Sequence, residues 1–374
     1  MGQSFITARL SLWLDLVRAV AAIAVLLGHI VQLGLYSGSW PFTIALQKNA
    51  VTVFFVLSGL VIASSVARGR GGHRGGLGEF ALARAKRVVP VAMLGIGAGL
   101  LVAALGDASE APLFAGAAQW PGNGEILRAV LFVSESWNSG FAPNPLMWSL
   151  VYEVWFYALF GAAMFLRGWN RAIWLAVLAA AAGPNILLLL PAWLVGAGLC
   201  HWTAARDLPR SLARPAAALA FAMLFVAPAI APVLLEGLSA VLPGWDLGFS
   251  LYALSDNLLA IAVVAGFIGL RKLAEDGLAI PERWAGTVRA FANISFTLYL
   301  LHWPLLKALQ MAGIGAGDSM VRFALLAALV VGACALLAML VERRTPHMPR
   351  CFANPISATK KGPTLSGGPF VKLV

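Results

Sequence analysis

Long apolar stretches separated by short polar segments dominate the chain. A helix that crosses a bilayer needs about 20 predominantly apolar residues. By this length criterion we predict about ten spans. Their approximate limits are 13–35, 44–66, 88–105, 146–167, 172–184, 186–203, 215–235, 252–270, 291–311 and 320–341. The pattern therefore predicts an all-α integral membrane protein, a bundle of about ten transmembrane helices with no soluble domain.

Three segments depart from this regular pattern. The stretch 172–184 is short and is joined to 186–203 through Gly183-Pro184-Asn185, so we expect a hairpin that does not fully cross. The longest intervening loop, about 106–145, has room for short helices, and loops beyond about 15 residues are often functional. Residues 347–374 are rich in Pro, Gly, Ser, Thr and Lys, which predicts a basic, disordered cytoplasmic tail after a transmembrane domain over 1–346.

Composition supports the membrane assignment. Only 11% of residues are charged and mean hydropathy is +0.83, whereas soluble domains carry about 25% charged residues. The net charge of +11 could suggest a nucleic-acid partner, but the basic residues lie between the apolar segments. Every second loop is basic, so we predict no nucleic acid and cytoplasmic termini. Cys200, Cys334 and Cys351 show no paired spacing, so we predict neither disulfides nor a metal site.

The first apolar stretch carries three ionisable residues, Asp15, Arg18 and His29. Such residues inside a span usually face the protein interior or a water-filled cavity. Arg18 and His29 are eleven residues apart, which places them on nearly the same helix face and about 16 Å apart along the axis. Asp15 is close enough to pair with Arg18. Alternatively, Arg18 extends to the membrane interface and His29 is a hydrogen-bonded core histidine.

Two further stretches admit two interpretations each. Ser58-Gly59 in the second span, taken alone, is typical of close helix packing. Arg84, Arg87 and Pro90 recur at a spacing of three before the third span. The arginines could meet anionic lipid headgroups or bind the phosphates of a nucleotide-bearing donor such as coenzyme A, and spacing alone does not choose.

The fourth span combines Trp148, Ser149 and Glu153. Ser149 and Glu153 are four residues apart and share a helix face. A carboxylate inside an apolar run needs a partner or a proton, whereas Trp148 could belong to an interfacial aromatic belt.

The ninth span carries a polar stripe of Ser295, Tyr299 and His302. Pro304 can kink this helix and free a backbone carbonyl. A purely structural polar stripe between helices is the alternative.

Taken together, these features resemble the acyltransferase-3 family of membrane O-acyltransferases, from Leu14 to about Pro346. The matching motifs are Arg18 with His29, FFVLSG at 54–59, Arg84 with Arg87 and Pro90, WSL at 148–150 with Glu153 and Phe156-Tyr157, SFTLYLLHWPLL at 295–306, and, with looser spacing, Glu342 before Pro346. Val154 and Trp155 replace the Glu-Gln pair that often follows Glu153, so one carboxylate remains there. The sequence shows no extracellular esterase-like domain, and we expect the whole reaction in the membrane domain.

The resemblance implies transfer of an acyl group, commonly acetyl, from acyl-CoA to a hydroxyl of an exported or cell-surface glycan such as exopolysaccharide or lipopolysaccharide. It implies a bacterial plasma (inner) membrane and no bound cofactor, with acyl-CoA as a co-substrate. His29 is the expected base because the pKa of histidine lies near working pH, Glu153 orients it or holds the acceptor, and His302 is the second candidate. The expected substrate-binding residues are Arg18, Arg84, Arg87, Ser58, Trp148, Ser149 and Tyr299.

The alternative function is a multi-span transporter or flippase for a glycan intermediate, which buried charges suit equally well. Against it, the sequence shows no inverted repeat and no pair of broken helices in matching halves.

Overall fold

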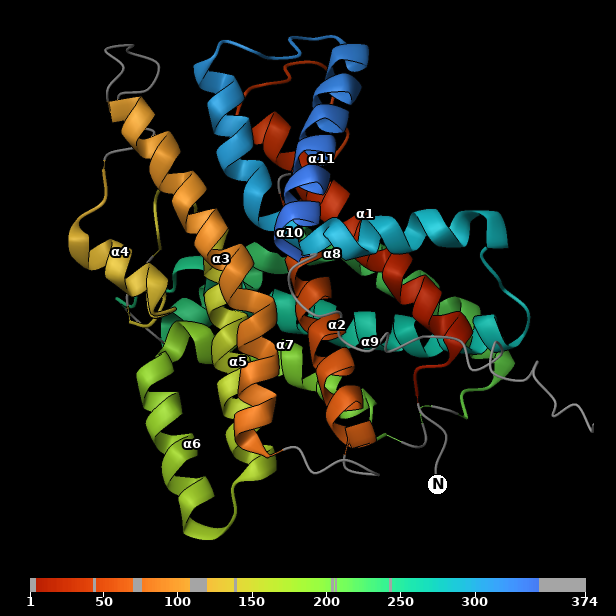
Figure 1. The fold of residues 1–374 in the computed structure, drawn as a ribbon. Coiled ribbons are helices and arrows are strands. Elements are labelled where there is room, and N and C mark those ends of the chain that lie inside the picture. Colours follow the sequence, from red (N-terminus) through yellow and green to blue (C-terminus); the bar gives the residue numbers. More distant parts are fainter. Residues whose placement is uncertain are drawn as a thin grey trace, which may run out of the picture.

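A computed structural model describes residues 5–42, 45–69, 76–107, 120–137, 140–202, 205, 207–241 and 244–342. Within these ranges the chain is all-helical, which confirms the predicted fold class (Figure 1). The elements are α1 (Ala8–Gln32), α2 (Ala45–Gly69), α3 (Leu77–Asp107), α4 (Asn123–Val130), α5 (Met147–Phe165), α6 (Gly168–Ala182), α7 (Pro184–Leu199), α8 (Arg210–Val241), η3 (Gly248–Ser250), α9 (Ala253–Glu275), α10 (Glu282–Met311) and α11 (Met320–Glu342). The predicted tail, 347–374, lies outside the described residues.

Each of the ten predicted spans falls on a helix. Seven of the described helices are singly long and apolar enough to cross a membrane. The pair α6 and α7 reaches that length only together and is bent by 118°, as Gly183-Pro184-Asn185 predicted. Gly183 adopts a φ of 83° there, a conformation that favours glycine. The long loop before α5 holds one short helix, α4, in its described part.

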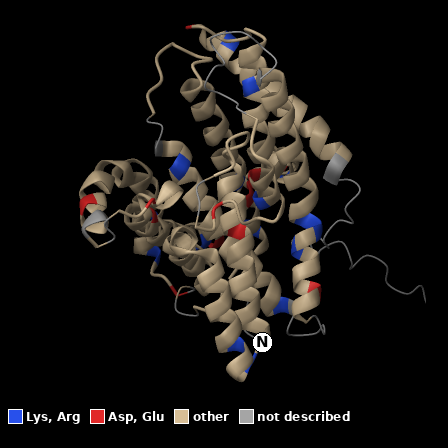
Figure 2. Cartoon of the chain, turned by 90° about the vertical axis from the view of Figure 1, so that its left-hand side faces the viewer, with Lys and Arg blue, Asp and Glu red and all other residues tan. Residues whose placement is uncertain are grey.

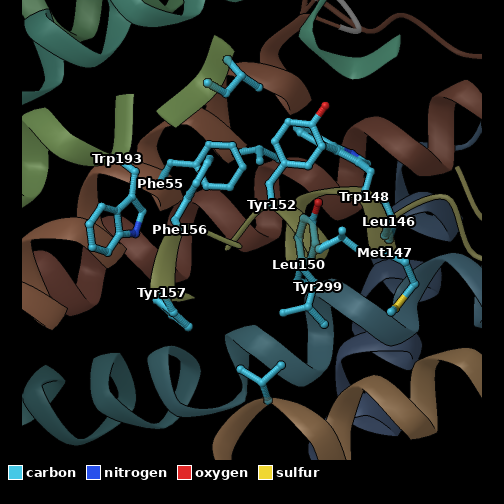
Figure 3. Packing of buried hydrophobic residues seen from close by; sticks show 14 of the residues in the cluster. Phe55, Leu146, Met147, Trp148, Leu150, Tyr152, Phe156, Tyr157, Trp193 and Tyr299 are labelled. Atoms are coloured by element: carbon cyan, nitrogen blue, oxygen red, sulfur yellow. The ribbon is translucent and has the colours of Figure 1, made fainter. Parts of the chain in front are cut away.

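Helix α5 occupies the centre of the largest buried cluster (Figure 3). Trp148, Tyr152 and Phe156 recur every four residues and therefore lie along one face. Phe55 of α2 packs against all three, with ring centroids 6.0, 6.4 and 5.3 Å away. Trp148 also stacks on Phe249 at 4.7 Å and is only 5% exposed. The idea that Trp148 belongs to an interfacial belt is therefore wrong, because its ring is buried in the core.

Helices α2 and α7 approach each other closely at two glycines. A Cβ atom on Gly59 would clash with the carbonyl oxygen of Trp193, and one on Gly196 would clash with that of Val56. The close-packing interpretation of Ser58-Gly59 is confirmed, because small residues let helix backbones approach within a membrane. This contact fixes the position of Ser58 beside α5.

Charged residues are sparse along the helices (Figure 2). An ion pair joins two helices: Lys48 Nζ of α2 lies 2.7 Å from Asp256 Oδ2 of α9. The Lys48 and Asp256 side chains are 24% and 3% exposed, respectively. The pair therefore ties the N-terminal ends of two spans together.

Candidate functional site

A cavity of about 140 Å³ lies among α1, α2, α3, α5 and α10. One water needs about 10–15 Å³ of such space, so the cavity has room for a small organic group. Its polar lining comes from segments far apart in the sequence. These residues are Ser11, Asp15, Arg18, Ser58, Arg87, Ser149, Glu153, Tyr157, Ser295 and Tyr299. The fold thus gathers six of the predicted site residues around one space: Arg18, Ser58, Arg87, Ser149, Glu153 and Tyr299.

Glu153 has the partners that a carboxylate in an apolar span requires. Its Oε1 atom accepts hydrogen bonds from Ser58 Oγ of α2 and from Tyr157 OH, one turn along α5. Trp193 of α7 donates a hydrogen bond from its Nε1 atom to Ser58 Oγ, at a distance of 3.2 Å. Glu153 is therefore held by α2 and by its own helix, and α7 supports it indirectly through Ser58, because Gly59 lets α2 pack against α7.

Ser149 pairs with Tyr299 rather than with Glu153. Its Oγ atom donates to Tyr299 OH at 2.7 Å, joining α5 to α10. Both residues line the cavity and both are buried, at 7% exposure. The polar stripe predicted on α10 therefore faces the cavity at Ser295 and Tyr299.

Two arginines reach the cavity from different helices, Arg18 of α1 and Arg87 of α3. Arg18 interacts electrostatically with Arg87, Asp15 and Glu153. Within the described part of the chain, neither arginine forms an ion pair within 4.0 Å. Their N–H groups are thus available to an anionic or carbonyl ligand. Arg84 does not line the cavity; its guanidinium lies 5.7 Å from the Phe80 ring.

The two candidate bases lie against each other. His29 Nδ1 is 2.8 Å from His302 Nε2, and the rings stack with centroids 5.1 Å apart. His302 Nδ1 lies 2.8 Å from the carbonyl oxygen of Leu298. The edge of Trp303 contacts His29 with a centroid distance of 5.1 Å. His302 is fully buried and His29 is 8% exposed.

The histidine pair and the cavity are neighbouring but separate. Neither His29 nor His302 lines the cavity, and Tyr299 connects the two groups, its ring centroid 6.2 Å from that of His302. The direct hydrogen-bonding partner of His29 is therefore a histidine and not Glu153. Any influence of Glu153 on His29 has to act through other residues.

Pro304 frees a backbone carbonyl, as predicted. Proline has no N–H group, so the Leu300 carbonyl lacks its usual helical donor. Asn144 Nδ2 donates to that oxygen at 2.9 Å and to the Gly95 carbonyl at 3.1 Å. Asn144, which sequence analysis missed, thus fixes the start of α5 against α3 and α10.

A second buried acid was also missed. Glu135, between α4 and α5, is 2% exposed. Burial raises the pKa of its carboxyl to about 8, and a hydrogen bond from the Gly140 backbone partly opposes this. Phe132 and Trp137, on either side, adopt φ values of 56° and 61°, which are uncommon for bulky residues. No motif in the sequence marks this turn.

Across the residues that the structure describes, no group of three His, Cys, Asp or Glu side chains could hold a metal ion. The Glu342 side chain and Pro346 lie outside the described side chains, so the closing motif is not placed.

Comparison with known proteins assigns the chain to a family. The sequence profile described as the acyltransferase domain of the acyltransferase-3 family matches residues 11–339. The chain matches no curated protein and no solved structure. The matched range runs from α1 into α11 and includes the cavity and both histidines. The chain thus belongs to the acyltransferase-3 family and is a multi-pass membrane acyltransferase.

Proposed function

We propose that the protein transfers an acyl group, most simply acetyl, from acyl-CoA to a hydroxyl of an exported or cell-surface glycan. The observation that carries this proposal is a cavity that brings Arg18 and Arg87 together and is also lined by Tyr299, whose ring lies beside that of His302 in the His29–His302 pair. A group-transfer site that accepts its donor from one side of a membrane and its acceptor from the other needs a donor-binding region next to a base.

The donor end of the site is the pair of arginines. Each guanidinium offers five N–H donors in a planar fork that suits phosphate and carbonyl oxygens. Arg87 lies in the N-terminal half of α3, and this helix follows a basic loop that the positive-inside rule assigns to the cytoplasm. We therefore place the donor entrance and both termini on the cytoplasmic side of a bacterial plasma membrane.

His29 is the proposed base. Arg18 and His29 are eleven residues apart on one helix, about 16 Å along its axis. The flexible pantetheine arm of coenzyme A, and not the acyl group alone, has to bridge this length. Because Tyr299 lines the cavity and His29 does not, we propose that a bound donor moves past the Tyr299 ring before its thioester reaches His29.

The proposed chemistry is acyl transfer with general base catalysis. His29 accepts the proton of the acceptor hydroxyl while the hydroxyl oxygen forms a bond to the thioester carbonyl carbon. The carbon–sulfur bond then breaks, and the proton passes from His29 to the departing thiolate, which yields the ester and free coenzyme A. Glu153 holds Ser58 and Tyr157 in the cavity wall, and we assign it to shaping the donor site.

Purified protein supplied with acetyl-CoA and with membranes that contain the native acceptor tests this proposal. We expect free thiol to appear with the wild type and with His201→Ala, a matched control at an exposed histidine after α7, but not with His29→Ala. Movement of the glycan across vesicles without thiol release would instead support the transporter alternative.

A further inference from the structure

We infer that His302 is a positioning residue, which fixes the proton of His29 on Nδ1 and leaves His29 Nε2 as the atom that accepts the hydroxyl proton. The hydrogen-bond arrangement follows from geometry alone. The role that it serves in acyl transfer depends on the proposed function.

The proton positions follow from one acceptor that cannot donate. A neutral imidazole has one N–H and one lone pair. The Leu298 carbonyl accepts only, so the nitrogen 2.8 Å from it, His302 Nδ1, carries the proton. His302 Nε2 then carries a lone pair and can only accept a hydrogen bond. The atom 2.8 Å from it, His29 Nδ1, must therefore be the N–H donor. His29 Nε2 is therefore unprotonated.

The reverse order of protons is disfavoured by burial. With the proton on Nε2, the Nδ1 lone pair of His302 would face a carbonyl lone pair at 2.8 Å. His302 has no exposed surface, so water cannot relieve that repulsion, and leaving buried polar groups without a partner costs about 1–3 kcal/mol each. One tautomer of the pair is thus strongly selected.

Helix α10 supplies all the groups that orient the His29 ring. Leu298 and His302 are one turn apart, and a carbonyl oxygen has two lone pairs, so the Leu298 carbonyl can serve both the helix and the ring. The next residue, Trp303, places its ring edge against His29. The His29 ring is consequently held by a hydrogen bond on Nδ1 and by an aromatic contact.

This arrangement makes His302 unsuitable as a second base and suits His29 for that task. Both ring nitrogens of His302 are engaged. When His29 Nε2 takes a proton, its Nδ1–H continues to donate to His302, now in a stronger, charge-assisted hydrogen bond. A carboxylate plays this orienting part in serine hydrolases. A neutral histidine provides the same acceptor without placing another charge within a membrane.

Nitrogen-15 NMR of the full chain, labelled at its five histidines, reads the tautomers directly. We expect His29 and His302 to be neutral and protonated on Nδ1 in the wild type. In His302→Leu, the Nδ1–H form of His29 should lose its dominance and acyl transfer to the native acceptor should fall by at least about 10²-fold. His302→Gln, whose amide oxygen can accept from His29 Nδ1, should keep the tautomer and most of the activity.

Three results would overturn the inference: a wild-type His29 protonated on Nε2, a His302→Leu variant that keeps both the Nδ1–H form and normal turnover, or equal losses in both variants with the His29 tautomer unchanged. The wild-type spectrum decides the proton positions even if a variant fails to fold. Wild-type protein with the expected tautomers but no thiol release would instead refute the proposed function and leave the hydrogen-bond assignment standing.

Discussion

Replacing Gly59 by alanine probes how the backbone packing of α2 and α7 supports the site. The added Cβ would overlap the Trp193 carbonyl oxygen and lie 2.9 Å from Ala197 N, both of them backbone atoms of α7. Non-bonded carbon and oxygen atoms settle at about 3.3–3.6 Å, so the helices must separate by about 1 Å. Overpacking of this kind costs about 1–3 kcal/mol.

The displacement should also affect activity, because Ser58 precedes Gly59 and links Trp193 to Glu153. We expect a lower unfolding temperature in detergent and weaker acyl-CoA binding. Gly198→Ala on α7 is the matched control, since a Cβ there meets nothing within 4 Å. If Gly59→Ala and Gly198→Ala unfold at the same temperature and bind acyl-CoA equally, the reasoning about the α2–α7 contact is refuted.

Three further predictions concern single charged groups. Arg87→Ala should weaken binding of acyl-CoA more than that of a short thioester lacking the nucleotide, as measured by competition; equal losses would show that Arg87 does not bind the nucleotide phosphates. The Glu135 carboxyl is protonated up to about pH 8 in the folded state but ionises above its ordinary pKa of 4.5 when unfolded, so the free energy of unfolding should fall as pH rises between these values. At about 1.4 kcal/mol per pKa unit, the free energy of unfolding should fall by about 5 kcal/mol over this pH range. Thermal unfolding of Glu135→Gln at several pH values should not show this fall. Parallel pH dependence of wild type and variant would contradict the prediction. Asp256→Asn, which leaves the Lys48 ammonium without its ion pair, should cost about 3 kcal/mol, and a chemical unfolding experiment in which it costs nothing would show that solvent already satisfies Lys48.

Much of the fold could be predicted because a bilayer restricts the chain. Apolar length alone locates the spans, and the break at Gly183-Pro184-Asn185 marks the bent α6–α7 pair. Helical spacing correctly indicated the two polar faces on α5 and α10, because it reflects the 3.6-residue period. Which helix meets which face depends on side-chain packing between spans, as at Gly59 and Gly196, and no local pattern encodes that choice.

Six of the ten residues predicted for the site line one cavity, but the contacts between them were not predicted. Sequence reasoning assigned Glu153 either to orienting His29 or to holding the acceptor, because a buried carboxylate needs a partner; in the structure Ser58 and Tyr157 are its hydrogen-bond donors. The true neighbour of His29 is His302, 273 residues away, a distance over which spacing rules carry no information. Glu135 was missed for a related reason, since a single acid in a loop acquires its perturbed pKa only through tertiary burial.

The central claim, that acyl transfer to a glycan proceeds through His29, is tested most directly by base-labile acyl groups on the surface glycan of cells. A strain with its chromosomal copy deleted would express wild type, His29→Ala or His201→Ala at equal membrane levels. We predict that wild type and His201→Ala restore the acyl groups and that His29→Ala leaves them at least about 10²-fold lower. Restoration to the wild-type level by His29→Ala would contradict the account.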